Sequence, residues 1–270
     1  ELKIKKFEKL INTSKKILIT THVNPDGDGI GSGLALLNKL LKLKKQVYFI
    51  NRDPLPEIYK FLPSSHRVKN FKKLKGKYDI AILLECPEIS RNGNIIDYVK
   101  QVKYTINIDH HLGNTMFADL NIVEPEAAAV GVQLYKIMKK LNWRIDRDVA
   151  MCLYTSIITD TGSFEYSNTT SEVLEIAAEL LKAGVNPEIV ASEVYATSIS
   201  STRLLEKMLS HLKIEDKVGW SFLSRGMFRI TGAKEAEADN FINFIRAIKE
   251  IEIAILFKEV EKKFIRVSFR

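Results

Sequence analysis

The segment Thr21–Asp28, with the sequence THVNPDGD, constrains the fold more than any other part of the chain. It directly follows the apolar run Ile17–Thr20, which we interpret as a buried strand, and directly precedes a run with helical spacing. It therefore places the side chains of His22, Asp26 and Asp28 on a glycine-rich turn at the carboxyl end of a strand, where open α/β sheets bind ligands. Because clustered carboxylates repel one another unless a cation neutralises them, the segment predicts a divalent metal site.

Three further segments carry a potential ligand where a regular element ends. One continuous apolar run, typical of a buried strand, ends on Glu85, and a second ends on Asp109, His110 and His111. A helix-like run carries Asp160 near its end. Because the carboxyl ends of parallel strands meet at one edge of a sheet, we expect these side chains to converge on the first turn.

The combined set of potential ligands is large and contains no thiolate. Its members are His22, Asp26, Asp28, Glu85, His110 and Asp160, with Asp109 and His111 close by. Six nitrogen and oxygen ligands are too many for one open catalytic ion, and they suit two ions about 3.5–4 Å apart that share a carboxylate. This ligand chemistry favours Mn²⁺ or Mg²⁺, with Zn²⁺ or Co²⁺ as alternatives, and we expect two Mn²⁺ ions.

Alternating strand and helix patterns occupy residues 1–170. This alternation is typical of an α/β fold with a doubly wound, mostly parallel sheet. We assign residues 1–184 to a first, metal-binding domain. Residues 185–198 are expected to form a linker helix that begins at Pro187, and residues 199–270 a smaller α+β domain.

The pattern in the smaller domain predicts short strands and one long helix. We expect strands at 212–215, 219–223 and 227–230, an amphipathic helix over 234–247, and paired strands at 251–257 and 264–269.

Composition argues against several classes of protein. No apolar run approaches the roughly 18 residues of a membrane span, and there is no signal-peptide pattern. The first residue is Glu1 rather than methionine, so the true N-terminus stays open. The two cysteines are too few for a disulfide framework or a zinc knuckle. We therefore expect a cytoplasmic protein without a membrane segment.

The chain is basic, with a formal net charge of +8. A basic surface attracts polyanions, although lysine-rich solvated faces are also common, particularly in thermophiles. The charge alone leaves both explanations open. The local run Phe71–Lys77 is expected to be a solvated loop rather than a binding patch.

Four motifs taken together resemble those of the DHH phosphoesterase superfamily. They are HVNPDGDGIGS at 22–32, the strand that ends on an acid at 85, DHH at 109–111, and TDTGSF at 159–164. The sequence EYSNTT that follows is similar to the nanoRNase and pAp-phosphatase branch, which is related to RecJ exonucleases. The motifs occur in the family's order over residues 22–170, whereas one motif alone would be weak evidence.

The resemblance implies a role for each candidate ligand. His22 and Asp26 would hold one ion, Asp28 and His110 the other, and Glu85 and Asp160 would lie between the ions and share in ligation. His111 would contact the scissile phosphate or protonate the leaving oxygen, and Asp109 would orient a neighbouring histidine. The candidate substrate-binding residues are Arg91, Asn168 and Arg270.

Two features depart from the family pattern. The family usually has Asp where this chain has Glu85, and the longer side chain could ligate in another geometry, weaken one ion or change the metal preference. The family's second domain, a substrate-binding domain, normally continues past Ser-x-Arg into a Gly-Gly-Gly-His loop. The sequence stops at Arg270 without that loop, so we expect either a fragment or a missing end.

The resemblance implies a metal-dependent hydrolase of short oligoribonucleotides that releases mononucleotides and also acts on adenosine 3′,5′-bisphosphate. Cyclic or linear dinucleotide hydrolysis and RecJ-like exonuclease activity are alternatives. A non-catalytic nucleotide-binding module is an alternative of another class, suggested by Glu85. The expected partners are short RNA or nucleotides, and a homodimer stays open.

Overall fold

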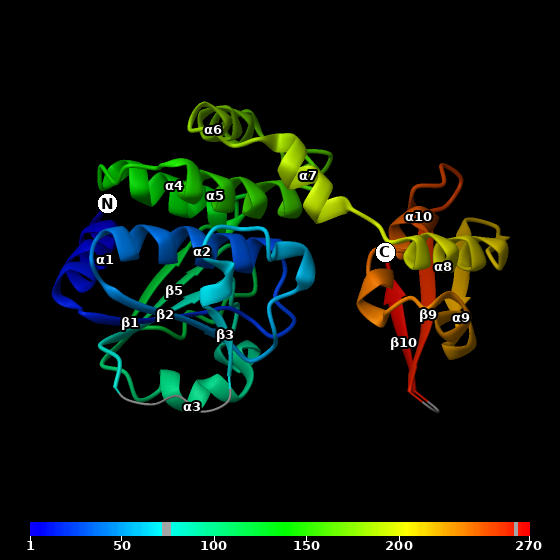
Figure 1. Ribbon diagram of the computed structural model, residues 1–270, viewed down its shortest axis with the longest axis horizontal. Helices are drawn as coiled ribbons and strands as arrows, with labels where there is room; N and C mark the ends of the chain where they lie inside the picture. Colours follow the sequence, from blue (N-terminus) through cyan, green and yellow to red (C-terminus); the bar gives the residue numbers. More distant parts are fainter. Residues whose placement is uncertain (72–76, 262–263) are drawn as a thin grey trace. The chain divides into compact units, whose positions relative to one another are not determined.

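The computed structural model describes residues 1–71, 77–261 and 264–270 (Figure 1). Most of the basic run predicted as a solvated loop therefore lies outside the described residues. The chain divides into two compact units, Glu1–Val194 and Tyr195–Arg270, which are described separately below.

The first unit contains a six-stranded sheet in which the paired strands are all parallel. Its strands, in chain order, are β1 (Lys16–Thr20), β2 (Gln46–Asn51), β3 (Val68–Asn70), β4 (Ile80–Leu84), β5 (Tyr104–Asp109) and β6 (Leu120–Val123). Their spatial order is β3-β2-β1-β4-β5-β6. The predicted α/β fold with a parallel sheet is confirmed, and β1, β4 and β5, which precede the candidate ligands, lie side by side.

Helices cover both faces of this sheet (Figure 1). They are α1 (Leu2–Thr13), α2 (Gly27–Lys42), α3 (Ile96–Val99), α4 (Val130–Lys140), α5 (Arg147–Asp160), α6 (Ser171–Lys182) and α7 (Pro187–Tyr195), with short 3₁₀ helices η1 (Glu57–Tyr59), η2 (Ser65–Arg67) and η3 (Ile89–Ile95). Because successive strand residues point to opposite faces, Ile17 and Ile19 join the core under α2, α4 and α5, whereas Leu18 packs toward α3.

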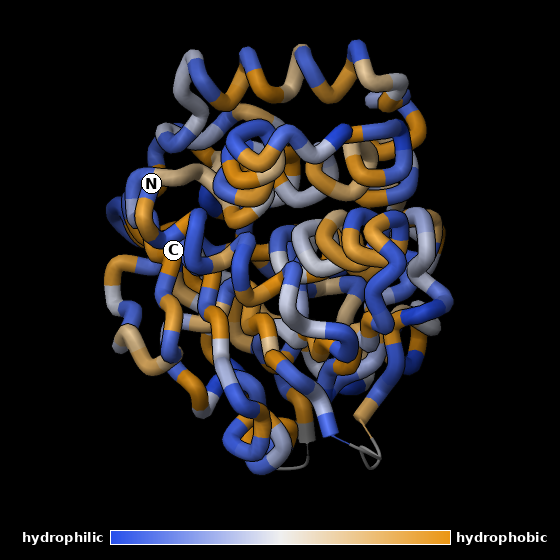
Figure 2. Tube along the Cα trace, turned by 90° about the vertical axis from the view of Figure 1, so that its left-hand side faces the viewer, coloured by the Kyte–Doolittle hydropathy of each residue, from blue (hydrophilic) through white to orange (hydrophobic). Residues whose placement is uncertain are grey.

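The outer helices are amphipathic, as their positions require. In Figure 2, hydrophilic and hydrophobic residues alternate along the turns of the uppermost helix, α6, whose buried residues are Val173, Ile176, Ala177 and Leu180. Helix α7 buries Val190 in the same core, so the first unit runs to Val194. The sequence predicts a linker helix at 185–198 that begins at Pro187, and α7 begins at that residue.

Close packing of α2, α4 and α5 fixes the ends of these helices relative to one another. A Cβ at Gly31 of α2 would lie 2.6 Å from the carbonyl oxygen of Cys152, and one at Gly131 of α4 would lie 2.1 Å from the Ser156 hydroxyl. Both glycines therefore let their helices approach α5 more closely than any side chain would allow. The contact brings the first turn of α2 and the first turn of α4 beside Ser156.

The second unit has a mixed four-stranded sheet in the order β10-β9-β8-β7. Its elements are α8 (Ile199–Ser210), β7 (Lys213–Glu215), β8 (Val218–Leu223), α9 (Arg225–Thr231), η4 (Glu235–Ala238), α10 (Ile242–Arg246), β9 (Ile253–Glu261) and β10 (Phe264–Phe269). Strands β9 and β10 pair antiparallel, as predicted, while β8 and β9 are parallel.

Two predictions in this unit are wrong. The segment expected as a strand at 227–230 lies in helix α9, because the Ser224 hydroxyl accepts a hydrogen bond from the Met227 backbone and caps the helix, and Gly232 ends it in a left-handed conformation. The single helix expected over 234–247 is split into η4 and α10.

Within the described part of the chain, no helix is both long enough and apolar enough to span a membrane.

Candidate metal centre

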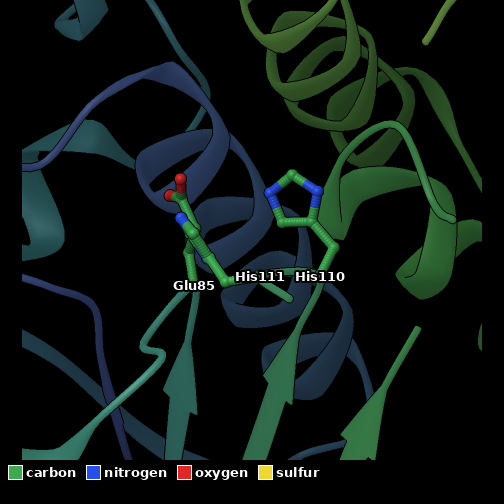
Figure 3. A group of neighbouring side chains, drawn as sticks. All are labelled: Glu85, His110 and His111. Atoms are coloured by element: carbon green, nitrogen blue, oxygen red, sulfur yellow. The ribbon is translucent and has the colours of Figure 1, made fainter. Parts of the chain in front are cut away.

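The carboxyl ends of β1, β4 and β5 bring the candidate ligands together at one edge of the sheet. Three groups of side chains each place ligand atoms within 4.8 Å of one another. They are His22, Asp26 and Glu85; Asp28, His110 and Asp160; and Glu85, His110 and His111. Figure 3 shows the third group above the ends of the strands, with Glu85 and His111 close together and His110 facing them. All six predicted metal ligands therefore converge, and His111 lies among them.

The first group surrounds the imidazole of His22. Its Nε2 lies 3.3 Å from Glu85 Oε2 and 3.7 Å from Asp26 Oδ1, while its Nδ1 lies 2.7 Å from the carbonyl oxygen of Val23. A carbonyl only accepts hydrogen bonds, so Nδ1 carries the proton and Nε2 is directed at the carboxylates. Burial lowers the pKa of His22, but the hydrogen bond and charge of Asp26 outweigh it and raise the pKa overall.

Asp26 has a structural function as well. It is the N-cap of α2, and its Oδ1 accepts hydrogen bonds of 3.1 Å from the backbone N–H groups of Asp28 and Gly29. Burial raises the pKa of Asp26, yet the hydrogen bond and charge of His22, followed by hydrogen bonds with Glu85 and the Gly29 N–H, bring it down to about 2. The side chain is thus an anion whose position is set by the start of the helix.

Glu85 reaches the centre from an unusual backbone conformation. Its φ of 55° lies in the left-handed region, which is rare for residues other than glycine. Its carboxylate is almost fully buried in space left by Gly29, where a Cβ would lie 2.8 Å from Oε2. Burial, followed by the negative charges of Asp26 and Asp28, raises the pKa of Glu85 well above its ordinary value. A cation would relieve this accumulation of charge.

Asp28 is the most completely bonded of the candidate ligands. Its Oδ1 accepts hydrogen bonds from the hydroxyls of Ser32 and Ser156 and from the backbone N–H of Gly131, and its Oδ2 accepts one of 2.7 Å from the N–H of Val130. Burial raises the pKa of this carboxyl. Asp28 therefore joins the first turns of α2 and α4 to the middle of α5.

His110 and Asp160 complete the second group. His110 Nε2 lies 3.7 Å from Asp28 Oδ2 and 3.4 Å from Asp160 Oδ2, and its Nδ1 lies 3.0 Å from the carbonyl oxygen of Ala127. As with His22, the carbonyl assigns the proton to Nδ1 and directs Nε2 toward the acids. Burial and the negative charge of Asp28 raise the pKa of Asp160, the last residue of α5, to about 7.

Asp109 belongs to none of the three groups and instead holds His111. Its carboxylate lies 2.8 Å from His111 Nδ1 and accepts a 2.6 Å hydrogen bond from the Asn114 amide. The hydrogen bond to Asp109 raises the pKa of His111. Burial raises the pKa of Asp109, but His111 and Asn114 lower it overall. The structure adds Asn114, which the sequence reasoning did not single out.

The three predicted substrate-binding residues occupy different positions. Arg91 is exposed in η3, and its carbonyl accepts a 2.7 Å hydrogen bond from the backbone of Val23, next to His22. The Asn168 amide donates to the carbonyls of Ala128 and Asp160, which ties it to the end of α5. Arg270 lies in the second unit, at the end of β10.

One known family matches the unit that carries these side chains. The sequence pattern of the DHH family, N-terminal domain, matches residues 16–157. The chain belongs to the DHH family. The predicted resemblance is therefore confirmed, and the matched residues include every candidate metal ligand except Asp160.

Its DHH-family relatives include two enzymes that share one name. The bifunctional oligoribonuclease and PAP phosphatase NrnA of Thermus thermophilus is 32% identical over 254 residues, which cover 94% of this chain and 75% of the relative. The enzyme of the same name from Bacillus subtilis is 26% identical over 263 residues, covering 94% of this chain and 80% of the relative. Among solved structures, an exopolyphosphatase-related protein from Bacteroides fragilis matches with a TM-score of 0.95 and 27% identity, over 100% of this chain and 83% of that one.

Proposed function

We propose that this protein is a two-metal phosphoesterase that hydrolyses short oligoribonucleotides to mononucleotides and removes the 3′-phosphate of adenosine 3′,5′-bisphosphate. The observation that carries the proposal is the convergence of two sets of ligands, one around His22 and one around Asp28, at one edge of the sheet. The names of the two NrnA relatives support the substrate class.

The donor set fits two divalent cations. His22, Asp26 and Glu85 would hold one, and Asp28, His110 and Asp160 the other. Nitrogen and carboxylate ligands without thiolate favour Mn²⁺, with Mg²⁺ or Co²⁺ as alternatives. Bound cations would supply charge stabilisation on the phosphoryl oxygens and increase the acidity of an attacking water. Glu85, in place of the usual Asp, would ligate from the space that Gly29 leaves open.

The protein's own groups would act on the substrate beside these ions. Asp109 fixes the ring of His111 through Nδ1, which leaves Nε2 to donate a proton or hydrogen bond to the phosphate. His111 is half-exposed, as a group that meets a substrate must be. Asn168 and Arg270 would contribute to substrate binding, the former through the end of α5.

The test is hydrolysis of a 5′-labelled RNA dinucleotide with Mn²⁺, with and without chelator, and of adenosine 3′,5′-bisphosphate in parallel. We expect chelator-sensitive release of mononucleotide from both substrates. Tight nucleotide binding with no release under any metal would contradict the proposal and favour a non-catalytic nucleotide-binding module. Cleavage confined to a cyclic dinucleotide would contradict the assigned substrate class.

A further inference from the structure

We propose that Arg52 and Arg91 form an anion subsite next to the metal centre, which binds a terminal phosphate of the substrate rather than the phosphate that is hydrolysed. This inference rests on the proposed function, because it names how that same site would select its substrates. Arg52 was not singled out from the sequence.

Three loops meet at this corner of the first unit. They are residues 21–24 after β1, residues 51–53 at the end of β2, and residues 91–93 within η3. The backbone N–H of Val23 donates to the carbonyl of Arg91 at 2.7 Å, and that of Asn24 donates to Asp53 Oδ2 at 2.8 Å. The segment that carries His22 is therefore hydrogen-bonded to the segment of Arg91 and to the segment of Arg52.

Two buried asparagines form hydrogen bonds with Thr21 in the first of these segments. Asn51 Oδ1 accepts a 3.1 Å hydrogen bond from the backbone N–H of Thr21, and the Asn92 amide donates to the carbonyl of Thr21 at 3.0 Å. Both asparagines are 0% exposed, and each directly neighbours one of the two arginines in sequence. The residue next to each arginine is consequently anchored by a buried hydrogen bond, which limits the motion of both arginines and reduces the entropy lost on binding.

Gly93 brings the Arg52 side chain into this corner. Its φ of 60° lies in the left-handed region, and a Cβ there would lie 2.5 Å from Arg52 Cδ and 3.2 Å from Val23 Cγ1. The aliphatic part of the Arg52 side chain therefore passes over Gly93 and lies beside Val23. Gly93 is two positions from Arg91 in sequence, and Val23 is one position from His22. Any side chain at residue 93 would displace it.

The charges of the two guanidinium groups are largely uncompensated. Arg52 is 54% exposed, and its Nε lies 4.0 Å from Asp53 Oδ1, at the limit of an ion pair. Asp53 is itself occupied by the backbone of Asn24. Arg91 is exposed and makes no ion pair within the described residues. A pair of guanidinium groups suits a terminal phosphate, because the planar fork of N–H donors matches two phosphate oxygens.

The experiment compares three RNA dinucleotides: unmodified ApA, ApA with a 5′-phosphate, and ApA with a 3′-phosphate. The quantity measured is kcat/KM on each phosphorylated dinucleotide divided by kcat/KM on ApA. For Arg52→Ala and for Arg91→Ala we expect this ratio to fall about tenfold or more on one of them, since charge-assisted hydrogen bonds to phosphate are lost. Arg52→Lys should retain part of the ratio, and which dinucleotide responds identifies the phosphate.

Gly93→Ala should reproduce part of the Arg52→Ala effect, because it displaces the arginine stem without removing its charge. The matched control is Arg147→Ala, an exposed arginine at the opposite end of α5 from Asp160, which should leave the ratio unchanged. An unchanged ratio in both arginine variants would overturn the subsite, and so would an equal loss on all three dinucleotides.

A binding measurement separates this inference from the proposed function. Affinities for the three dinucleotides are measured by calorimetry with Ca²⁺, which screens the carboxylates. If the wild-type protein binds one phosphorylated dinucleotide more tightly than ApA and Arg52→Ala removes that preference, the subsite stands even if no hydrolysis occurs. If the wild type hydrolyses RNA but neither affinity nor ratio depends on the arginines, the hydrolase stands and the subsite falls.

Discussion

The two halves of the candidate centre are held in place by different means. Asp28 is surrounded by neutral donors, two serine hydroxyls and two backbone N–H groups at the start of α4. Glu85 instead faces His22 and the charged Asp26 from a left-handed backbone position. One half is therefore organised by protein hydrogen bonds, whereas the other gathers charge that only a cation or a proton can balance.

This difference predicts that Asp28 and Glu85 contribute differently to stability and to activity. Asp28 satisfies backbone groups of α4 that would otherwise be buried without partners, so the fold depends on it. Among the described residues, the Glu85 side chain bonds the His22 imidazole and no backbone group, and its buried charge opposes folding. We therefore expect the fold to need Asp28 and only the chemistry to need Glu85.

The largest effect should come from Asp28→Asn. It exchanges an anion for a neutral amide whose NH₂ group faces other donors, and it removes a proposed metal ligand. Since metal stabilisation is worth several kcal/mol, we expect turnover of an RNA dinucleotide to fall by about a thousandfold or more, together with a lower Tm of the metal-free protein.

Glu85→Gln is the matched variant for that comparison. It should lose turnover similarly. The Tm of the metal-free protein at pH 8 should be unchanged or higher, because the raised pKa of Glu85 means that ionising this carboxyl in the folded protein costs free energy, and glutamine removes that cost. A Tm that falls equally in both variants would break the contrast between the two halves.

Gly29→Ala should have the next largest effect. Its Cβ would lie 2.3 Å from the Thr21 hydroxyl and 2.8 Å from Glu85 Oε2, so the carboxylate must move. A displacement of about 1 Å in a catalytic site costs about a hundredfold in rate. Steady-state kinetics on the dinucleotide measures this loss. Gly226→Ala, where a Cβ meets only the Ser224 hydroxyl at 3.5 Å, serves as control, and similar rates in both variants would contradict the tight fit around Glu85.

Ser156→Ala tests the other half. Removing its hydroxyl takes one donor from Asp28 without touching a ligand atom, and loss of such a supporting hydrogen bond weakens metal binding about tenfold. Calorimetric titration with Mn²⁺ in the absence of substrate measures the change. Thr155→Ser retains a hydroxyl that bonds the Met151 carbonyl and should bind Mn²⁺ normally. Wild-type affinity in Ser156→Ala would mean that the remaining donors suffice.

The smallest effect is expected for Glu85→Asp. Aspartate tolerates a left-handed backbone and restores the side-chain length that is usual in the family. Activity with Mn²⁺ should stay within about tenfold of wild type or rise, a difference of no more than about 1.4 kcal/mol in the barrier. A much larger loss would indicate that the glycine cavity and the backbone at residue 85 have adapted to glutamate.

The sequence located the centre because its residues occupy the ends of strands. Once β1, β4 and β5 are recognised as parallel neighbours, geometry alone brings His22, Glu85 and His110 to one edge. Their roles as ligands stay predictions. Ser156, Asn114 and Arg52 were missed because nothing local marks them. Ser156 and Arg52 gain their importance from residues distant in sequence, Asp28 and Gly93, and Asn114 gains its importance from a side-chain contact with Asp109 that the loop between them creates.

Errors in the second unit have a local physical cause. The apolar residues at 227–230 suggested a strand, but the capping hydroxyl of Ser224 and the left-handed Gly232 delimit a helix of two turns. Hydrophobic periodicity over so few residues does not separate the two structures.

Binding of two cations at this edge of the sheet is measured by anomalous diffraction at the manganese edge from crystals grown with Mn²⁺. We expect two anomalous peaks about 3.5–4 Å apart, one beside His22 and Glu85 and one beside Asp28 and His110. A single peak, or none within this cluster in Mn²⁺-saturated crystals, would contradict this expectation.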